Sequence, residues 1–280
     1  MCSRVPDRAL TCRCRAPASR SVAAPSRAGL VRSQVVLPVD AWSGLALVEP
    51  VVEGNRNEVW RATRHGESCA VRRSRRSESS LRWELGLIEF LSRKGFVVPT
   101  VVSTDDNQLH HEGVVVQRWI EGRPPISETD WIAVAAELQR LHELTRVHRQ
   151  RPGCCVVTDL HTRRVSVDAD LDAMPLDARA FVESVFVKFS DVPTAVVHGD
   201  PSASNIRMTA TGQVGLLDWD ESRVDLAWHD LSNLGVPVLA HVEHQRALAL
   251  SHAWEAANAW TAEPGYASTR LAQLEQRRNI

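Results

Sequence analysis

Residues 194–219 are the segment that most restricts what this chain can fold into. Their residue pattern predicts, in this order, a strand, a polar loop, a second strand, a turn at Thr211-Gly212 and a third strand. The loop contains Asp200, and the amide side chain of Asn205 follows five positions later. Because the turn folds the last two strands into a hairpin, Asp218 can return beside Asn205. The pattern predicts two carboxylates and one amide gathered at the end of a small β structure.

Phosphoryl transfer requires this set of groups. One carboxylate can orient an attacking hydroxyl and accept its proton, while an amide oxygen and a second carboxylate can hold Mg²⁺ on nucleotide phosphates. Each residue also has a plainer explanation: Asp200 precedes a proline and could open a turn, Asn205 could be an ordinary loop amide, and Asp218 could cap a strand end. We favour the functional interpretation, because otherwise three plain explanations would have to coincide.

The same residues carry a family resemblance. His198-Gly199-Asp200 with Asn205, followed by Leu217-Asp218-Trp219-Asp220, resembles the H-G-D-x-x-x-x-N and I-D-W-[DE] motifs of the aminoglycoside phosphotransferase and choline kinase-like family. The similarity extends from about residue 45 to about residue 235. It implies an α+β, two-lobed protein-kinase-like fold, with a small antiparallel sheet and one helix in the amino-terminal lobe and a mainly helical carboxy-terminal lobe.

The resemblance also implies an activity. The chain is expected to be a kinase that moves the γ-phosphate of ATP, or GTP, to a hydroxyl group of a small molecule. Asp200 would be the base or orienting residue, and Asn205 and Asp218 would bind Mg²⁺. His198 is expected to brace the loop rather than to move protons. Asp225 and Asp230 resemble acids that support the catalytic loop, although surface helix caps explain them equally well.

Nucleotide-binding residues are expected in the amino-terminal region. Gly54 and Asn57 lie in a turn between two predicted strands, 45–52 and 58–63, and resemble the family's phosphate-covering loop. A single glycine gives backbone amides less freedom to approach a phosphate than a glycine-rich loop does, so the same residues could be a simple hairpin turn. Further along, the backbone groups of Gln117 and Trp119 are expected to face a purine edge.

One position departs from the family. A lysine is expected on the third strand, and Arg72 is found there instead; the only lysines are Lys94 and Lys188, neither of which can substitute. Glu84 matches the acid that pairs with that lysine, although it could also be an exposed helical charge. Arg72 keeps the positive charge but holds its donors in a planar fork. We therefore expect a working replacement, with a nucleotide-binding regulatory pseudokinase as the alternative.

The remaining elements follow from hydrophobic periodicity. Helices are predicted at 80–94, 127–144, 175–189 and 236–260, and further strands at 68–72, 97–103 and 113–120. Residues 1–34 show neither helical nor strand periodicity and are expected to be a disordered extension rich in Arg, Ser and Ala. Residues 35–120 would then form the nucleotide-binding lobe, and residues 121–280 the catalytic and substrate lobe.

Charge and composition limit the partners. The chain has 33 basic and 34 acidic residues, and seven Arg and one Asp fall in residues 1–34, so the rest carries 26 basic and 33 acidic side chains. This acidic body argues against nucleic acid as a partner. With Asp220, Glu221 and Asp225 near the proposed site, it favours a cationic acceptor such as an amino sugar or amino alcohol.

The sequence also bears on the cellular location and on the oligomeric state. No run approaches the roughly 20 apolar residues of a membrane-spanning helix. The cysteines lack paired C-x-x-C spacing, which favours a reduced, cytoplasmic protein. A monomer or weak dimer is expected. A protein kinase is disfavoured, because only residues 219–224 separate Asp218 from the following elements and leave no peptide-binding segment.

Overall fold

The computed structural model describes residues 37–51, 59–189 and 191–277. The amino-terminal part is a four-stranded antiparallel sheet in the order β1-β2-β3-β4. The strands are β1 (Leu45–Val51), β2 (Val59–Arg64), β3 (Glu67–Arg73) and β4 (Val114–Arg118). This confirms the predicted small sheet. The lobe boundary at residue 120 stays a prediction, and residues 1–34, Gly54 and Asn57 lie outside the described residues.

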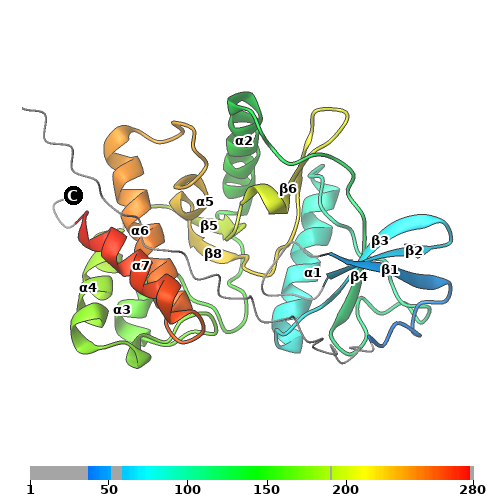
Figure 1. The fold of residues 1–280 in the computed structure, drawn as a ribbon, viewed down its shortest axis with the longest axis horizontal. Helices are drawn as coiled ribbons and strands as arrows, with labels where there is room; N and C mark the ends of the chain where they lie inside the picture. Colours follow the sequence, from blue (N-terminus) through cyan, green and yellow to red (C-terminus); the bar gives the residue numbers. More distant parts are fainter. Residues whose placement is uncertain (1–36, 52–58, 190, 278–280) are drawn as a thin grey trace, which may run out of the picture. The chain divides into compact units, whose positions relative to one another are not determined.

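Helix α1 (Glu78–Arg93) is inserted between β3 and β4 and lies beside the sheet in Figure 1. The Ser77 side chain accepts a hydrogen bond from the Ser80 backbone N–H and so caps the helix start. Gly95 follows the helix with a φ of 80°, which a glycine adopts without strain. The buried face is formed by Ser80, Leu81, Glu84, Leu85, Leu87, Ile88 and Leu91. It therefore contains one carboxylate among mainly apolar side chains.

The carboxy-terminal part is mainly helical, as predicted. Its longer helices are α2 (Glu128–Thr145), α4 (Leu176–Phe186), α6 (His241–Ala259) and α7 (Pro264–Glu275). Shorter helical turns are η1 (Val157–Asp159), α3 (Leu160–Arg163), η2 (Leu171–Ala173), η3 (Val187–Phe189), η4 (Ala203–Asn205) and α5 (Trp228–Leu231). Helices α6 and α7 pack side by side (Figure 1). The helix predicted at 236–260 begins only at His241, because Pro237 follows Gly235, whose φ is 71°.

Two small antiparallel strand pairs carry the motif loops. Strand β5 (Thr194–Val197) pairs with β8 (Arg223–Leu226), and β6 (Ile206–Met208) pairs with β7 (Val214–Leu216). The loop with Asp200 leaves β5, and the turn with Asp218 joins β7 to β8. The predicted hairpin is confirmed, and it sets both motifs at neighbouring strand ends.

The strand predicted at 97–103 does not form as one unit. Val97 makes a single bridge to Gly215 in β7, whereas Val101 makes a single bridge to Gln117 in β4. Pro99 lies between them and has no N–H to continue a ladder. The segment is therefore shared between the β6–β7 hairpin and the amino-terminal sheet.

Three groups of buried apolar side chains form the core. One lies within the amino-terminal sheet around Val71 and Val116. A second joins α1 and α2 to the β6–β7 hairpin and to Trp219. A third packs α4 against α6 around Phe186 and Trp254. Since the second cluster includes residues from α1 and from the Asp218 turn, these two elements share one packed interior.

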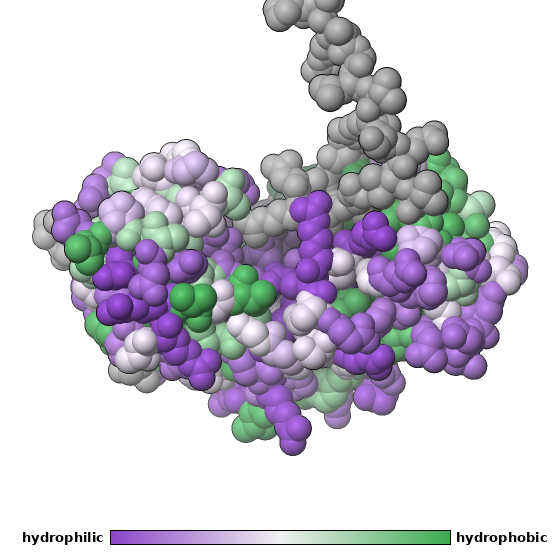
Figure 2. All heavy atoms as spheres, turned by 90° about the horizontal axis from the view of Figure 1, so that it is seen from below, coloured by the Kyte–Doolittle hydropathy of each residue, from purple (hydrophilic) through white to green (hydrophobic). Residues whose placement is uncertain are grey.

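The molecular surface is mixed in character. On the face shown in Figure 2, hydrophobic side chains form small groups among hydrophilic ones. Within the part of the chain that the structure describes, no helix is both long enough and apolar enough to cross a bilayer.

Candidate active site

The loop that begins at His198 is held through its backbone. Asp230, in α5, is fully buried, and its carboxylate accepts the backbone N–H groups of His198 (2.7 Å) and Gly199 (2.9 Å). It also accepts the Nε2–H of His142 at 2.9 Å. Burial alone would raise the pKa of Asp230, but the hydrogen bonds from His142 and from the backbone of Gly199 hold it below its ordinary value. Asp230 therefore supports the loop and does not serve as a surface helix cap.

His198 is buried, and its side chain also supports the loop that contains Asp200. Its Nε2 lies 2.7 Å from the carbonyl oxygen of Leu217, to which it donates, and its ring packs against Trp219 with centroids 4.9 Å apart. The side chain thus links the Asp200 loop to the turn with Asp218. Gly199 has a φ of 93°, and a Cβ there would lie 2.6 Å from the carbonyl oxygen of Glu221. Only glycine allows the two segments to approach this closely.

Asp200 and Asn205 are direct neighbours. The Nδ2 of Asn205 donates to the Oδ2 of Asp200 at 2.8 Å and to the Asp200 carbonyl oxygen at 3.0 Å. The Asn205 carbonyl oxygen accepts from the backbone N–H of Leu217 at 2.8 Å, which places Asn205 beside the residue that precedes Asp218. The side-chain bonds orient the Asn205 amide so that its Oδ1 is left for another partner.

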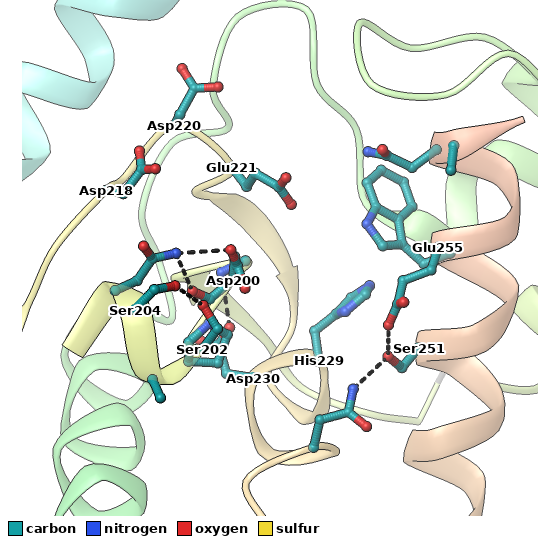
Figure 3. Close-up of a pocket in the computed structure, with 18 of the residues that line it drawn as sticks. Asp200, Ser202, Ser204, Asp218, Asp220, Glu221, His229, Asp230, Ser251 and Glu255 are labelled. Carbon is teal, nitrogen blue, oxygen red and sulfur yellow. Dashed lines mark hydrogen bonds between the residues drawn. The ribbon is translucent and has the colours of Figure 1, made fainter. Parts of the chain in front are cut away.

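Asp218 stands at the end of β7 in the left-handed backbone region, with a φ of 51°. Aspartate tolerates this region better than most residues, but a non-glycine residue held there is uncommon and often functional. In Figure 3 the carboxylates of Asp218, Asp220 and Glu221 lie along one side of the space above Asp200. One oxygen of Asp220, Oδ1, is buried and has no hydrogen-bond partner within the described part of the chain.

Two cavities meet at these residues. The larger, of about 790 Å³, is lined by Asp200, Asn205 and Asp218 and by residues of α6 and α7. The smaller, of about 120 Å³, is lined by Asn205 and Asp218 and by the strands of the amino-terminal sheet. Asn205 and Asp218 thus line both cavities, whereas Asp200 lines only the larger. The three residues that the sequence predicts to gather do gather here.

The smaller cavity is lined by Arg72, the residue found where the family resemblance predicts a lysine. Arg72 is buried, pairs with Glu84 of α1, and donates through Nε to the Gln117 side chain at 3.3 Å. Among the residues that the structure describes, none is a hydrogen-bond partner of its Nη1. Burial lowers the pKa of Arg72, and the negative charges of Asp218 and Asp220 act in the opposite direction. The guanidinium therefore lies within the electrostatic reach of the acidic turn.

The expectation that backbone groups of Gln117 and Trp119 face a purine stays a prediction, but one of these groups is already bonded. The backbone N–H of Trp119 is not free to face a purine, because it donates to the Ser68 carbonyl oxygen at 3.1 Å. Gln117 acts here through its side chain, which bonds Arg72 and the Pro99 carbonyl oxygen at 3.1 Å. Both residues still line the smaller cavity.

Asp225 supports a different part of the chain from the one predicted. Its carboxylate accepts the backbone N–H of Val157 at 3.0 Å and pairs with the buried guanidinium of Arg223 at 2.8 Å. Strand β8 places it on the side facing the helical core rather than on the Asp200 loop. A carboxylate that neutralises a buried arginine has a structural function there.

The wall of the larger cavity was not predicted from the sequence. Helices α6 and α7 contribute Ser251, Trp254, Glu255 and Tyr266 to it, and His229 lies between this wall and Asp230 (Figure 3). Burial, followed by the positive charge of Arg223, lowers the pKa of His229 to about 4, so its ring is neutral at pH 7. Helical periodicity locates α6 but does not reveal which of its residues line a cavity.

The donor set at the junction fits a magnesium ion. Mg²⁺ prefers oxygen ligands and is commonly held by one or two carboxylates together with substrate phosphates. Asn205 Oδ1 and the Asp218 carboxylate are such donors, and the unpartnered Oδ1 of Asp220 lies on the same turn. Within the described ranges, no three His, Cys, Asp or Glu side chains form a metal site by themselves.

The class of protein follows from this arrangement. A four-stranded sheet with a buried Arg–Glu pair adjoins a helical part that presents an acid, an amide and a second acid, which are groups that suit phosphoryl transfer. The chain belongs to the phosphotransferase enzyme family named APH, whose model matches residues 48–272. No curated protein sequence matches the chain.

Solved structures show the same fold. Choline kinase LicA from Streptococcus pneumoniae is 16% identical, with a TM-score of 0.62 over 85% of this chain and 95% of that one. Amicoumacin kinase hAmiN, in complex with AMP-PNP, Ca²⁺ and Ami, is 16% identical, with a TM-score of 0.57 over 84% and 87%. An aminoglycoside phosphotransferase from Alicyclobacillus acidocaldarius is 19% identical, with a TM-score of 0.54 over 89% and 95%.

Proposed function

We propose that this phosphotransferase moves the γ-phosphate of ATP to a hydroxyl group of a small cationic molecule, with Mg²⁺ as cofactor. The observation that carries the proposal is the junction of the two cavities, where Asn205 and Asp218 line both and Asp200 lines only the larger. A nucleotide in the smaller cavity would direct its terminal phosphate at Asn205 and Asp218. An acceptor in the larger cavity would reach Asp200.

The smaller cavity has the groups that a nucleotide needs. Gln117 and Trp119 line it beside Arg72, whose unpartnered Nη1 can donate to a phosphate oxygen. The carboxylate of Glu84 forms an ion pair with the guanidinium of Arg72 and so fixes its position. Mg²⁺, held by Asn205 and Asp218, would neutralise charge on the phosphates. The amicoumacin kinase structure, which contains AMP-PNP and Ca²⁺, supports the binding of a nucleotide and a divalent cation by this fold.

Asp200 would act on the acceptor. Asn205 occupies its Oδ2, so the other carboxylate oxygen can accept the acceptor's hydroxyl proton. The hydroxyl oxygen then forms a bond to the γ-phosphorus, the bond to the bridging oxygen of ADP breaks, and the proton passes to Asp200. Because the loop backbone is fixed by Asp230, the carboxylate is positioned before the acceptor arrives.

The charge of the larger cavity favours a cationic acceptor. Of the described residues, seven acidic ones and one arginine line it, and His229 adds no positive charge at pH 7. The acidic residues are Asp200, Asp218, Asp220, Glu221, Asp230, Glu255 and Glu263. A cavity lined mainly by one sign of charge raises the local concentration of ligands of the opposite sign. Amino sugars and amino alcohols carry both the required hydroxyl and a positive charge.

A nucleotide-binding pseudokinase is the second candidate. It is favoured by Arg72, which stands where the family has lysine and is held by both Glu84 and Gln117. The catalytic candidates Asp200, Asn205 and Asp218 are nevertheless gathered at one place, and a protein that only binds nucleotide has no chemical need of Asp200.

The test is a phosphate-transfer assay on a panel of amino sugars, amino alcohols and uncharged alcohols with Mg·ATP. We expect transfer to at least one cationic acceptor. Asp200→Asn should lower kcat by about 10²- to 10⁴-fold while ATP still raises the melting temperature. Asp177→Asn, an exposed acid at the start of α4, is the control and should have wild-type activity. ATP binding with no transfer to any acceptor would support the pseudokinase instead.

A further inference from the structure

Arg151 follows α2 in the sequence, and its side chain is completely buried. Its backbone is fixed beside β8 by Gln150, whose Oε1 accepts the N–H of Arg151 (2.7 Å) and of Val224 (3.0 Å). Burying an arginine is costly unless its donors are satisfied. The partners that satisfy it come from two separate elements.

On one side, Arg151 bonds α1. Its Nε donates to the Ser80 Oγ at 2.7 Å, and its Nη2 donates to the Glu84 Oε2 at 2.9 Å. The other oxygen of Glu84, Oε1, accepts from Arg72. A single fully buried carboxylate is therefore shared between the arginine of the smaller cavity and Arg151.

On the other side, Arg151 bonds the turn that follows Asp218. Its Nη1 lies near three backbone carbonyl oxygens, those of Trp219 (3.2 Å), Asp220 (2.7 Å) and Ser222 (3.0 Å). Arg76, just before α1, donates to the same Asp220 oxygen at 2.8 Å. The backbone of the acidic turn is thus fixed largely by guanidinium groups, and it cannot shift without changing these bonds.

A continuous buried path results, from Arg72 through Glu84 and Arg151 to the turn with Asp218. We infer that Arg151 is a positioning residue that couples the phosphate-facing arginine to the metal-facing acid. This inference rests on the proposed function, since it assumes ATP beside Arg72 and Mg²⁺ beside Asp218. Arg151 touches neither ligand; it sets the relative position of the two groups that do.

The coupling predicts a measurable property. Binding of ATP at Arg72 and of Mg²⁺ at Asp218 should favour the same arrangement of α1 and the turn, so Mg²⁺ should tighten ATP binding through Arg151. Arg151→Gln keeps polar contacts but removes the charge and most of the donors. Arg151→Lys keeps the charge toward Glu84 but cannot reach α1 and all three carbonyl oxygens at once.

The experiment is calorimetric titration of each variant with ATP, once with excess Mg²⁺ and once with excess chelator. We expect both Arg151 variants to bind metal-free ATP within about threefold of wild type. The factor by which Mg²⁺ tightens binding should fall by at least about fivefold in Arg151→Gln and by less in Arg151→Lys. Thermal unfolding of every variant is recorded in parallel to separate coupling from stability.

Arg223→Lys is the matched control. Arg223 is equally buried and is also paired with a carboxylate, Asp225. It stacks on Trp254 of α6 and donates from Nη1 to the Glu221 carbonyl oxygen at 3.2 Å, but it does not share the Glu84 carboxylate with Arg72. It should lose stability and keep the full Mg²⁺ effect. Ser80→Ala removes only one anchor of Arg151 on α1 and serves if Arg151→Gln does not fold; it should show a smaller loss of the same Mg²⁺ effect.

The outcomes are distinct. An unchanged Mg²⁺ effect in the folded Arg151 variants, or in Ser80→Ala when Arg151→Gln does not fold, overturns the coupling and leaves the proposed function intact. An equal loss in Arg223→Lys also overturns it, because the effect would then reflect general destabilisation. Wild-type protein that binds no ATP would overturn the proposed function and the coupling with it.

Discussion

Glu84 offers the most direct test of how buried charges compensate one another in this protein. Its carboxylate is fully buried and lies between the guanidinium groups of Arg72 and Arg151. Glu84→Gln preserves the shape of the side chain but removes the negative charge. Two buried positive charges then share one neutral amide, and the amide NH₂ group must face a guanidinium donor.

Removing one partner of a buried ion pair costs about 3–5 kcal/mol, because the remaining charge is left without compensation. For a chain of this size each kcal/mol lowers the melting temperature by about 2–4 °C, so Glu84→Gln should melt roughly 6–20 °C below wild type. Glu78→Gln is the matched control on the same helix. Glu78 is exposed and pairs with Arg82 at the surface, so its substitution should leave the melting temperature close to that of the wild type.

A double substitution tests the reason for the loss. Glu84→Gln combined with Arg151→Met removes the carboxylate together with one of the two charges that it compensates. We expect the double variant to lose less stability than the sum of the two single variants, as measured by urea unfolding. Strict additivity, or a Glu84→Gln variant as stable as Glu78→Gln, would refute the claim that this carboxylate balances both arginines.

Three further predictions concern single positions. Arg72→Lys should keep or improve phosphate transfer, because lysine retains the charge beside Glu84; complete loss of kcat would show that the site depends on the guanidinium and its bond to Gln117. Gly199→Ala should lose more stability and more activity than Gly212→Ala, since both have a positive φ but only the first places a Cβ 2.6 Å from a backbone oxygen. His229→Gln should reduce the acid sensitivity of folding. In the wild type the unfolded His229 binds a proton below about pH 6.5 and the folded one only below about pH 4, so about 2 kcal/mol of stability is lost between pH 7 and pH 5. The free energy of unfolding is measured with urea at pH 7 and pH 5. If His229→Gln loses as much stability between these pH values as the wild type does, His229 is not the cause of the acid sensitivity.

The elements that sequence analysis predicted well are those set by local pattern. Hydrophobic spacing locates α1 and places Glu84 on its buried face, which makes a pairing with Arg72 possible. The turn at Thr211-Gly212 likewise brings Asp218 back beside Asn205. In both cases a short range of sequence contains the physical cause, either a helical period or a turn that fixes a hairpin.

What the sequence could not reveal depends on distant partners. Arg151 is one arginine in a chain whose basic residues are nearly all arginine, and nothing local distinguishes it from an exposed one. Asp225 and Asp230 looked alike as acids after the motif, but β8 turns Asp225 toward Arg223, whereas α5 turns Asp230 toward the loop. Which backbone groups near Trp119 are already bonded is likewise decided only when β3 and β4 pair.

The support of the loop by Asp230 has a practical consequence. The bonds that fix the backbone at His198 and Gly199 come from Asp230, whereas the Asp200 carboxylate bonds the side chain of Asn205. Position 200 can therefore be exchanged while the chain at His198 and Gly199 keeps its path, and asparagine would also keep an oxygen acceptor for the Asn205 amide. Such a protein would lose the reacting charge while the backbone that precedes it keeps its support from Asp230.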